Sequence, residues 1–374
     1  MRTLIKADWV VTPDGRELRN GVVVVEKGRV KEYLPEEPEG DFKLFRVKGV
    51  LYPPFVNCHT HLELSWMEFD PDRFKDFFQW LLWIIGSRST KTLEELKAAV
   101  KKGVRLLKES GTYYAGDISS FGVSPNLKFE GVELLCYREF IGRELNPKEL
   151  PPPISIHSVY SVSFEAIKAI AADSLERNYK FQIHLAETAQ EQAFVKCRKN
   201  AFEELIYPVL GRKRYEKVCA EEVVDYLKRA GALNRNAIAV HCVNLTEKEI
   251  EELQRAEVSV VFCPRSNLHL KVGFPRVEKF LDYPFVGLGT DGLSTNADLS
   301  VVEELRTLYY RLDCQVPVKK LFPLITYKGA KVLGISDYGK KAVFTVAEGT
   351  FASPYQPILK SRQKFAVLDF SNTL

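Results

Sequence analysis

The sequence predicts an α/β fold: a (β/α)8 TIM barrel over residues 51–330, joined to a small β-sandwich domain formed by the N- and C-terminal segments. Two observations carry this prediction. Short apolar runs alternate with helical patterns through the middle of the chain, whereas both ends show only short strand patterns and turns. A chain of 374 residues is also long enough for one large domain with an attachment.

The two ends of the chain are expected to form one small β domain. Residues 1–50 contain β-branched runs separated by Asp14-Gly15 and Lys27-Gly28, which are typical of turns between hairpin strands. Late in the chain the pattern returns to short strands. We expect these late strands to pair with the N-terminal ones, so that residues 331–374 complete the small domain.

Eight apolar runs are expected to form the barrel. Most of them are separated by helical patterns, such as 93–100 and 246–253, and this alternation favours a closed barrel over an open two-domain sheet. The predicted strands are 50–57, 112–118, 132–138, 153–157, 180–184, 237–241, 258–263 and 285–289.

Composition and charge narrow the class of partner. The formal charge of +4 is small, and basic clusters such as 212–214 are short, which argues against nucleic-acid binding. No apolar run reaches the roughly 18 residues of a membrane span, and Asp8 comes too early for a signal peptide. Seven scattered cysteines without a CxxC pair predict free thiols in a reducing cytoplasm. We therefore expect a cytoplasmic monomer or homodimer with a small-molecule substrate.

Four histidines and one aspartate stand where predicted barrel strands end. His59 and His61 close the first run, and side chains two residues apart on a strand share a face. His184 ends the fifth run, His241 ends the sixth, and Asp291 follows the eighth. Chemistry in such barrels gathers at the carboxyl ends of the strands, so these groups should meet at one mouth. Imidazoles with a carboxylate suit zinc or ferrous iron and leave a position open for water.

The alternative is that each of these side chains is an ordinary buried residue at the end of a strand. That explanation is adequate for any one histidine. For five residues at matching strand ends it requires a coincidence, and we therefore favour a metal site.

These motifs resemble the amidohydrolase superfamily, and more narrowly its mononuclear deaminase and chlorohydrolase branch. The resemblance covers nearly the whole chain and implies one divalent metal, Zn²⁺ or Fe²⁺. Dinuclear relatives carry a carboxylated lysine after the fourth strand, where this chain has His157, which favours a single metal. The segments that carry the resemblance are 57–63 (NCHTHLE), 184–188 (HLAET), 263–267 (CPRSN) and 289–291 (GTD). The metal ligands that it implies are His59, His61, His184 and Asp291.

The resemblance also implies the catalytic residues. Glu187, three residues after His184, would act as general base and then as general acid, with Asp291 taking part in the same proton transfer. His241 would polarise the substrate more than bind the metal. The alternative for Glu187 is a glutamate in the first turn of a helix, stabilised by the helix dipole.

Three residues are predicted to contact the substrate. His157 occupies the position after strand four where deaminase relatives place a histidine on the substrate. Trp66 belongs to an aromatic segment, 62–89, whose helical part (74–85) is expected to be core while the rest stacks on a planar heterocycle. Arg138 follows the third strand and could bind a polar or anionic group, although surface pairing is equally compatible with its position.

Within this branch, residues 61–65 and 77–81 resemble aminodeoxyfutalosine deaminases, which act on an adenine-bearing nucleoside in the futalosine route to menaquinone. Deamination of S-adenosylhomocysteine, methylthioadenosine or guanine stays open, as does hydrolysis of a chlorinated ring or a cyclic amide. His61-Leu62-Glu63 also resembles the HxE of cytidine-type zinc deaminases, but the PCxxC that they need is absent. A metal-binding scaffold without activity is the remaining class, and the presence of Glu187 argues against it.

Overall fold

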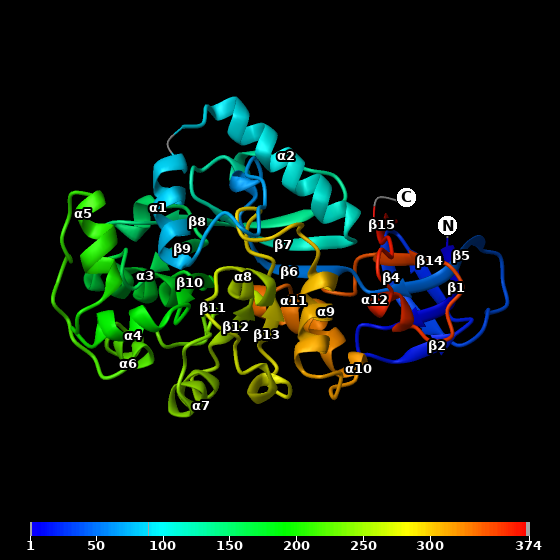
Figure 1. The fold of residues 1–374 in the computed structure, drawn as a ribbon. Coiled ribbons are helices and arrows are strands. Elements are labelled where there is room, and N and C mark those ends of the chain that lie inside the picture. Colours follow the sequence, from blue (N-terminus) through cyan, green and yellow to red (C-terminus); the bar gives the residue numbers. More distant parts are fainter. Residues whose placement is uncertain (1, 89, 372–374) are drawn as a thin grey trace.

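The computed structural model describes residues 2–88 and 90–371, and in this part of the chain the strands form two separate sheets. One sheet has eight parallel strands and curls into a barrel, as predicted (Figure 1). Its strands follow one another in chain order: β6 (Phe55–Thr60), β7 (Thr112–Ser119), β8 (Glu133–Phe140), β9 (Ile154–Ser158), β10 (Phe181–Leu185), β11 (Ala237–His241), β12 (Ser259–Phe262) and β13 (Val286–Leu288).

Most barrel strands are buried on both faces, which explains why they appear in the sequence as continuous apolar runs, whereas β8 is mostly half-buried. Seven of the eight predicted strands begin within one residue of the observed ones. The first prediction, 50–57, is wrong, because two strands share that run. Pro53 and Pro54 separate them, since proline has no N–H to donate and restricts the residue before it.

The first and last barrel strands meet at their carboxyl ends. Thr60 and Asp291 form a parallel bridge, and the amide of Asp291 donates to the carbonyl of His59 at 3.1 Å. Gly289 permits this approach, because a Cβ at that position would lie 2.7 Å from the Cβ of His59. Barrel closure therefore places the first and the last predicted metal ligands side by side.

Helices surround the barrel (Figure 1). The two helical patterns singled out in the sequence both form helices that begin with a capping box, Thr92 with Glu95 and Thr246 with Glu249. The helices are α1 (Phe77–Arg88), α2 (Leu93–Glu109), α3 (Phe164–Glu176), α4 (Ala189–Val195), α5 (Tyr207–Val209), α6 (Val223–Arg229), α7 (Glu247–Arg255), α8 (Pro264–His269), α9 (Val301–Arg311), α10 (Val318–Leu321), α11 (Tyr327–Leu333) and α12 (Gln356–Leu359). No helix in the described ranges is long and apolar enough to cross a membrane.

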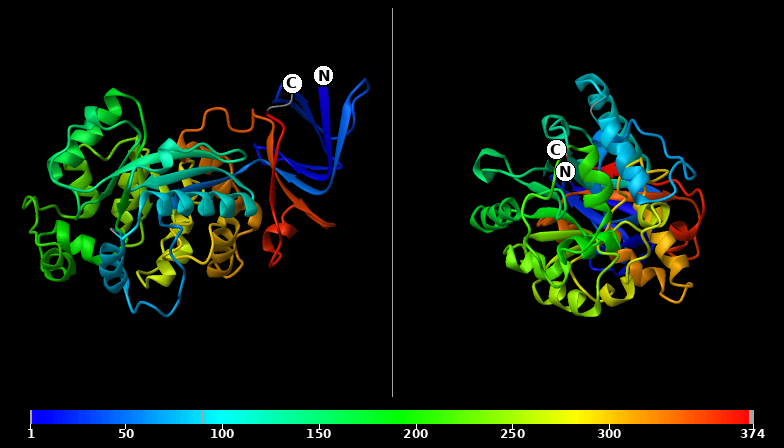
Figure 2. Two further views of the ribbon diagram at one scale, coloured as in Figure 1. Left: turned by 90° about the horizontal axis from the view of Figure 1, so that it is seen from above. Right: turned by 60° about the vertical axis from the view of Figure 1, so that its left-hand side comes forward.

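The second sheet is mixed and is built from both ends of the chain, as predicted (Figure 2). Its order is β15-β14-β5-β1-β3-β4, with β2 paired to β1. Thr345 joins this sheet to the barrel, because its hydroxyl accepts from the amide of Phe55 and donates to the carbonyl of Gly111. The domain boundaries at residues 50 and 330 remain predictions. The strands are β1 (Arg2–Val11), β2 (Glu17–Arg19), β3 (Val22–Glu26), β4 (Arg29–Leu34), β5 (Lys43–Tyr52), β14 (Val343–Glu348) and β15 (Ala366–Asp369).

The prediction that all seven cysteines are free is wrong. Cys197 and Cys219 form a disulfide that ties the end of α4 to the segment before α6. The two residues are 22 positions apart, so only the path of the chain between them brings the thiols together. With this disulfide present, the cysteines do not indicate a reducing compartment. The other five cysteines in the described residues are free.

Replacing both bridged cysteines, Cys197→Ser with Cys219→Ser, should lower the free energy of unfolding by about 3 kcal/mol, because the link restricts the unfolded chain. Urea unfolding of the two proteins measures the difference. The exposed free thiol provides the control, since Cys314→Ser should change the unfolding free energy by no more than about 0.5 kcal/mol. Equal free energies of unfolding for the double variant and the unaltered protein would contradict the expectation.

Candidate active site

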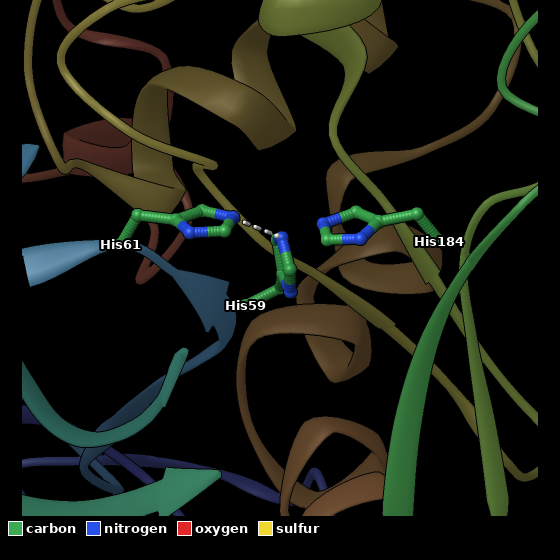
Figure 3. Close-up of side chains that lie close together, drawn as sticks. All are labelled: His59, His61 and His184. Carbon is green, nitrogen blue, oxygen red and sulfur yellow. Dashed lines mark hydrogen bonds between the residues drawn. The ribbon is translucent and has the colours of Figure 1, made fainter. Parts of the chain in front are cut away.

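Three histidine rings converge at the carboxyl ends of the barrel strands. One potential ligand atom from each of His59, His61 and His184 lies within 4.8 Å of the other two (Figure 3). The Nε2 atoms of His59 and His61 are 3.2 Å apart, and Oδ1 of Asp291 lies 3.4 Å from Nε2 of His61 and 3.9 Å from Nε2 of His59. The structure thus brings the four predicted metal ligands together.

Hydrogen bonds on the outer side of these groups turn their potential metal-binding atoms inward. Nδ1 of His59 donates to Oε1 of Gln182 at 2.8 Å, and Nδ1 of His184 donates to the carbonyl of His157 at 2.6 Å. These bonds leave the Nε2 lone pairs facing inward. The second carboxylate oxygen of Asp291 accepts from Ser266 and Thr295, which leaves Oδ1 facing the histidines.

The donor set fits a divalent cation. Imidazole nitrogens and a carboxylate oxygen crowd around one point, and a cation there would compensate their converging lone pairs. Within the described residues, buried Nδ1 of His61 has no hydrogen-bond partner, so no bond at that nitrogen orients the ring. Binding of a metal by these four residues remains a prediction.

Gln182→Leu should weaken metal binding about 10- to 100-fold, because it removes the acceptor that orients the ring of His59. Competition with a chelator measures the affinity, and a melting curve checks the fold. Gln254→Leu makes the same chemical change on the outer helix α7 and should leave the affinity unaltered. Equal metal affinity in the two variants would remove Gln182 from the site.

Burial keeps the imidazoles of His59, His61 and His241 neutral near pH 7 by lowering their pKa values. Burial, with neighbouring imidazoles, lowers the pKa of His59 well below its usual range, and burial also lowers the pKa of His61. Burial lowers the pKa of His241 to about 4. Burial would raise the pKa of Asp291, but the nearby His61, His241 and His59 outweigh it and lower that pKa. Neutral imidazole and ionised carboxylate are the forms that bind a metal.

Glu187 and His241 face each other beside this centre. Oε1 of Glu187 lies 3.7 Å from Nε2 of His241, whose Nδ1 is hydrogen-bonded to Oδ1 of Asn267 at 2.8 Å. Burial and the carboxylates of Asp291 and Glu191 raise the pKa of Glu187 well above its usual range. A carboxyl group of this kind can carry a proton at neutral pH. Helix α4 begins at Ala189 and has Glu191 in its first turn, so Glu187 lies before the turn that the alternative explanation required.

The backbone at these strand ends is strained. Ala186, His241, Cys242 and Asp291 have φ values of 50°, 74°, 50° and 57°, in the left-handed region that residues other than glycine seldom adopt. The amides of Ala186 and Glu187 donate to the carboxylate of Glu191, which stabilises the bend after β10. Strain of this kind collects at functional sites, where the surrounding structure maintains it.

The centre opens into a cavity of about 430 Å³, a size typical of small-molecule sites. Helix α1 supplies much of the apolar wall, through Trp80, Leu81, Ile84 and Ile85. Six of the predicted site residues line this cavity: His61, His157, His184, Glu187, His241 and Asp291.

The prediction that Trp66 contacts the substrate is not supported. Its ring packs beside Lys91, whose Nζ lies 4.6 Å from the ring centre, and it is not part of the cavity wall. Much of the helical part of the aromatic segment is core, as expected, through Phe77, Leu81 and Ile84, but the helix also turns one face to the cavity. Ser89, at the end of that segment, lies outside the described residues.

Arg138 also lies outside the cavity. Its Nη1 donates to the carbonyl of Pro151, and its neighbour Glu139 points inward instead. Strand β8 continues two residues beyond the predicted end, so the alternation of side chains decides which residue faces the site. Glu139 forms an ion pair of 2.9 Å with Arg88 of α1, a residue that the sequence reasoning missed.

His157 lies in the cavity, with its ring centre 5.2 Å from that of His184. Its Nδ1 is hydrogen-bonded to Oγ of Ser161 at 2.7 Å, which leaves the other nitrogen without a partner among the hydrogen bonds of the described chain. Burial lowers the pKa of His157 to about 3. His269, at the end of α8, packs against Phe69.

Glu63 does not act as the glutamate of an HxE motif. Its buried carboxylate accepts from the amides of Phe121, Val123 and Ser124 at 2.6, 2.7 and 2.9 Å, and from the hydroxyl of Ser119 at 2.6 Å. Glu63 therefore orders the loop after β7. The three cysteines next to the motif residues are buried free thiols, as expected: Cys58, Cys242 and Cys263.

Comparison with known proteins agrees with this geometry. A family model described as "Amidohydrolase family" matches residues 50–372. The chain is 26% identical over 372 residues to a 5-methylthioadenosine/S-adenosylhomocysteine deaminase of Clostridium tetani, covering 89% of this chain and 80% of that protein.

Two solved structures share the fold. Helicobacter pylori aminofutalosine deaminase in complex with methylthio-coformycin has a TM-score of 0.81 at 21% identity, covering 97% of each chain. An adenosine deaminase from Xanthomonas campestris with bound zinc has a TM-score of 0.74 at 22% identity, covering 92% of this chain and 84% of that one.

Proposed function

Because the chain belongs to the amidohydrolase family and is a hydrolase that acts on carbon–nitrogen bonds, we propose that it is a metal-dependent deaminase of an adenine-bearing nucleoside. One observation carries the proposal. A single cavity contains the converging donors His61, His184 and Asp291 together with the buried pair Glu187 and His241. Metal ligands next to a proton carrier are what hydrolytic removal of an amino group requires.

The proposed metal is one divalent ion, Zn²⁺ or Fe²⁺, which His59, His61, His184 and Asp291 would hold. When bound, such an ion lowers the pKa of water from about 15.7 to roughly 7 and makes hydroxide available at neutral pH.

Glu187 is proposed to move the protons. Its carboxylate would accept one proton from the attacking water and deliver it to a ring nitrogen of the substrate. It would then accept the second proton, from the hydroxyl group that has added to the ring carbon, and pass it to the amine as the carbonyl forms and ammonia leaves. The raised pKa of Glu187 supports this cycle, because the group must be able to hold a proton between the two transfers. His241 lies 3.7 Å from the same carboxylate, and Asn267 holds its ring so that Nε2 faces the reacting group.

The leading substrate that we propose is aminodeoxyfutalosine, which would place the enzyme on the futalosine route to menaquinone. The fold similarity to the H. pylori enzyme and the apolar wall of the cavity support this choice. His157 is proposed to contact the nucleoside. The second candidate is S-adenosylhomocysteine or methylthioadenosine, which the C. tetani relative favours by its name. A cytoplasmic location and a monomeric or homodimeric state remain expectations.

An ammonia-release screen tests the proposal. The metal-loaded protein is incubated with aminodeoxyfutalosine, S-adenosylhomocysteine, methylthioadenosine, adenosine, guanine and a chlorotriazine. We expect kcat/KM to be at least about 10-fold higher for aminodeoxyfutalosine than for the other nucleosides, since one well-placed polar contact contributes roughly that factor. Glu187→Gln protein from the same preparation controls for contaminating deaminases. Turnover of guanine or the triazine without turnover of any adenine nucleoside would reject the proposal.

A further inference from the structure

Arg212 brings a positive charge to the cavity from outside the barrel. It lies between Cys197 and Cys219, in the segment that the disulfide closes, and it lines the cavity together with Ile206 and Leu210. This segment contains α5, which lies beyond the carboxyl ends of the strands (Figures 1 and 2). Arg212 therefore enters the cavity from a different element than the strand-end residues of the metal centre.

Neutral groups hold the guanidinium of Arg212 in place. Nη1 donates to the hydroxyl of Tyr215 at 2.5 Å, and Nη2 donates to the carbonyl of Tyr160 at 3.4 Å. The ring centres of Tyr207 and Tyr215 lie 4.8 and 5.0 Å from Cζ, the guanidinium carbon of Arg212. Buried Nε has no hydrogen-bond partner in the described residues, so the hydrogen-bonding capacity of the group is not used up.

The other charged side chains of the cavity have partners. Arg88 pairs with Glu139 at 2.9 Å, Glu187 faces His241, and Asp291 faces the histidines. No carboxylate lies within 4.0 Å of Arg212 among the residues that the structure describes. In a largely apolar cavity, a positioned guanidinium without a counter-charge favours an anionic group on the ligand, because carboxylates bind arginine strongly there.

We infer that Arg212 binds a carboxylate carried by the substrate at the end away from its adenine. This inference rests on the proposed function and names the substrate class more narrowly: a nucleoside with an acidic 5′ substituent. Carboxylate is favoured over phosphate because Arg212 is the one cation of the cavity wall, within the described ranges, that lacks a carboxylate partner. A doubly charged phosphate would be bound more strongly if a second unpaired cation lay beside Arg212.

The test compares substrates that differ only in this charge. Aminodeoxyfutalosine ends in a carboxylate, and its methyl ester has nearly the same shape without the charge. We expect the unaltered enzyme to prefer the acid over the ester by about 10- to 100-fold in kcat/KM, mainly through KM, which is the range of a hydrogen bond to a charged group. Arg212→Gln should abolish this preference, and Arg212→Lys should retain part of it.

Lys213→Gln is the matched control. It removes the same charge at the next, exposed position, and it should leave the preference for the acid unaltered. Adenosine monophosphate tests the competing anion, and its turnover in preference to the acid would replace carboxylate by phosphate and overturn the inference.

Further outcomes separate this inference from the proposed function. Equal turnover of acid and ester by the unaltered enzyme overturns the role of Arg212 while the deaminase proposal stands. Equal losses for acid and ester in Arg212→Gln would show that the residue only supports the cavity wall. If the enzyme deaminates no adenine nucleoside at all, the proposed function fails first.

Discussion

Glu187→Gln is expected to lower kcat by about 100-fold or more while the protein keeps its metal. The amide preserves the size of the side chain and its place opposite His241, but it cannot accept and return a proton. Since Glu187 is not among the proposed ligands, elemental analysis should find the same metal content as in the unaltered protein. Steady-state ammonia release gives kcat and KM separately, and the loss should appear in kcat.

Glu204→Gln supplies the comparison for this variant. Glu204 is exposed and pairs with Lys199 at 2.9 Å, so the same chemical change there should leave turnover unaltered. A Glu187→Gln enzyme with near-normal kcat would exclude Glu187 from proton transfer. Loss of metal together with loss of turnover would instead mean that Glu187 belongs to the metal site.

His61→Ala is expected to remove both the metal and the activity. The Nε2 atom of His61 lies 3.2 Å from that of His59 and 3.4 Å from Oδ1 of Asp291, so its loss opens the donor set. Metal content should fall from about one ion per chain to a small fraction, and kcat/KM should fall by about three orders of magnitude, which corresponds to several kcal/mol of lost stabilisation. Elemental analysis and ammonia release measure the two effects.

His269→Ala is the matched control, because His269 packs against Phe69 away from the cavity. It should keep the full metal content and turnover. A His61→Ala protein that retains stoichiometric metal would refute the proposed ligand set. Loss of metal in His269→Ala as well would mean that histidine substitution disturbs the fold in general.

Much of the barrel could be predicted because most of its strands are buried on both faces. Such strands need apolar residues throughout, and helices with their own capping residues separate them, as at Thr92 and Thr246. The site could be predicted for a related reason. Parallel strands end at one face of the barrel, so polar residues at strand ends such as His184 and His241 must meet there.

The predictions that failed share one physical cause. Each depended on the direction in which a side chain points, or on which distant segment of the chain packs nearby. Arg138 and Glu139 are adjacent on β8, so their side chains alternate, and it is Glu139 and not Arg138 that faces the cavity. Trp66 and Trp80 are both aromatic, and the orientation of α1 is what places Trp80, and not Trp66, in the wall of the cavity. Cys197 and Cys219 carry no spacing signal for the bond between them.

By itself, the sequence determined the barrel, the small sheet made from both chain ends, and the residues that stand at the strand ends, because burial and hydrogen bonding act on local patterns. Only the tertiary structure decided which groups face one another: the contact of Glu187 with His241, the bonds that leave Nε2 of His59 and His184 free, and the entry of Arg212 into the cavity. These arrangements depend on barrel closure and on the packing of α1 and the disulfide-linked segment, which bring together residues far apart in the chain.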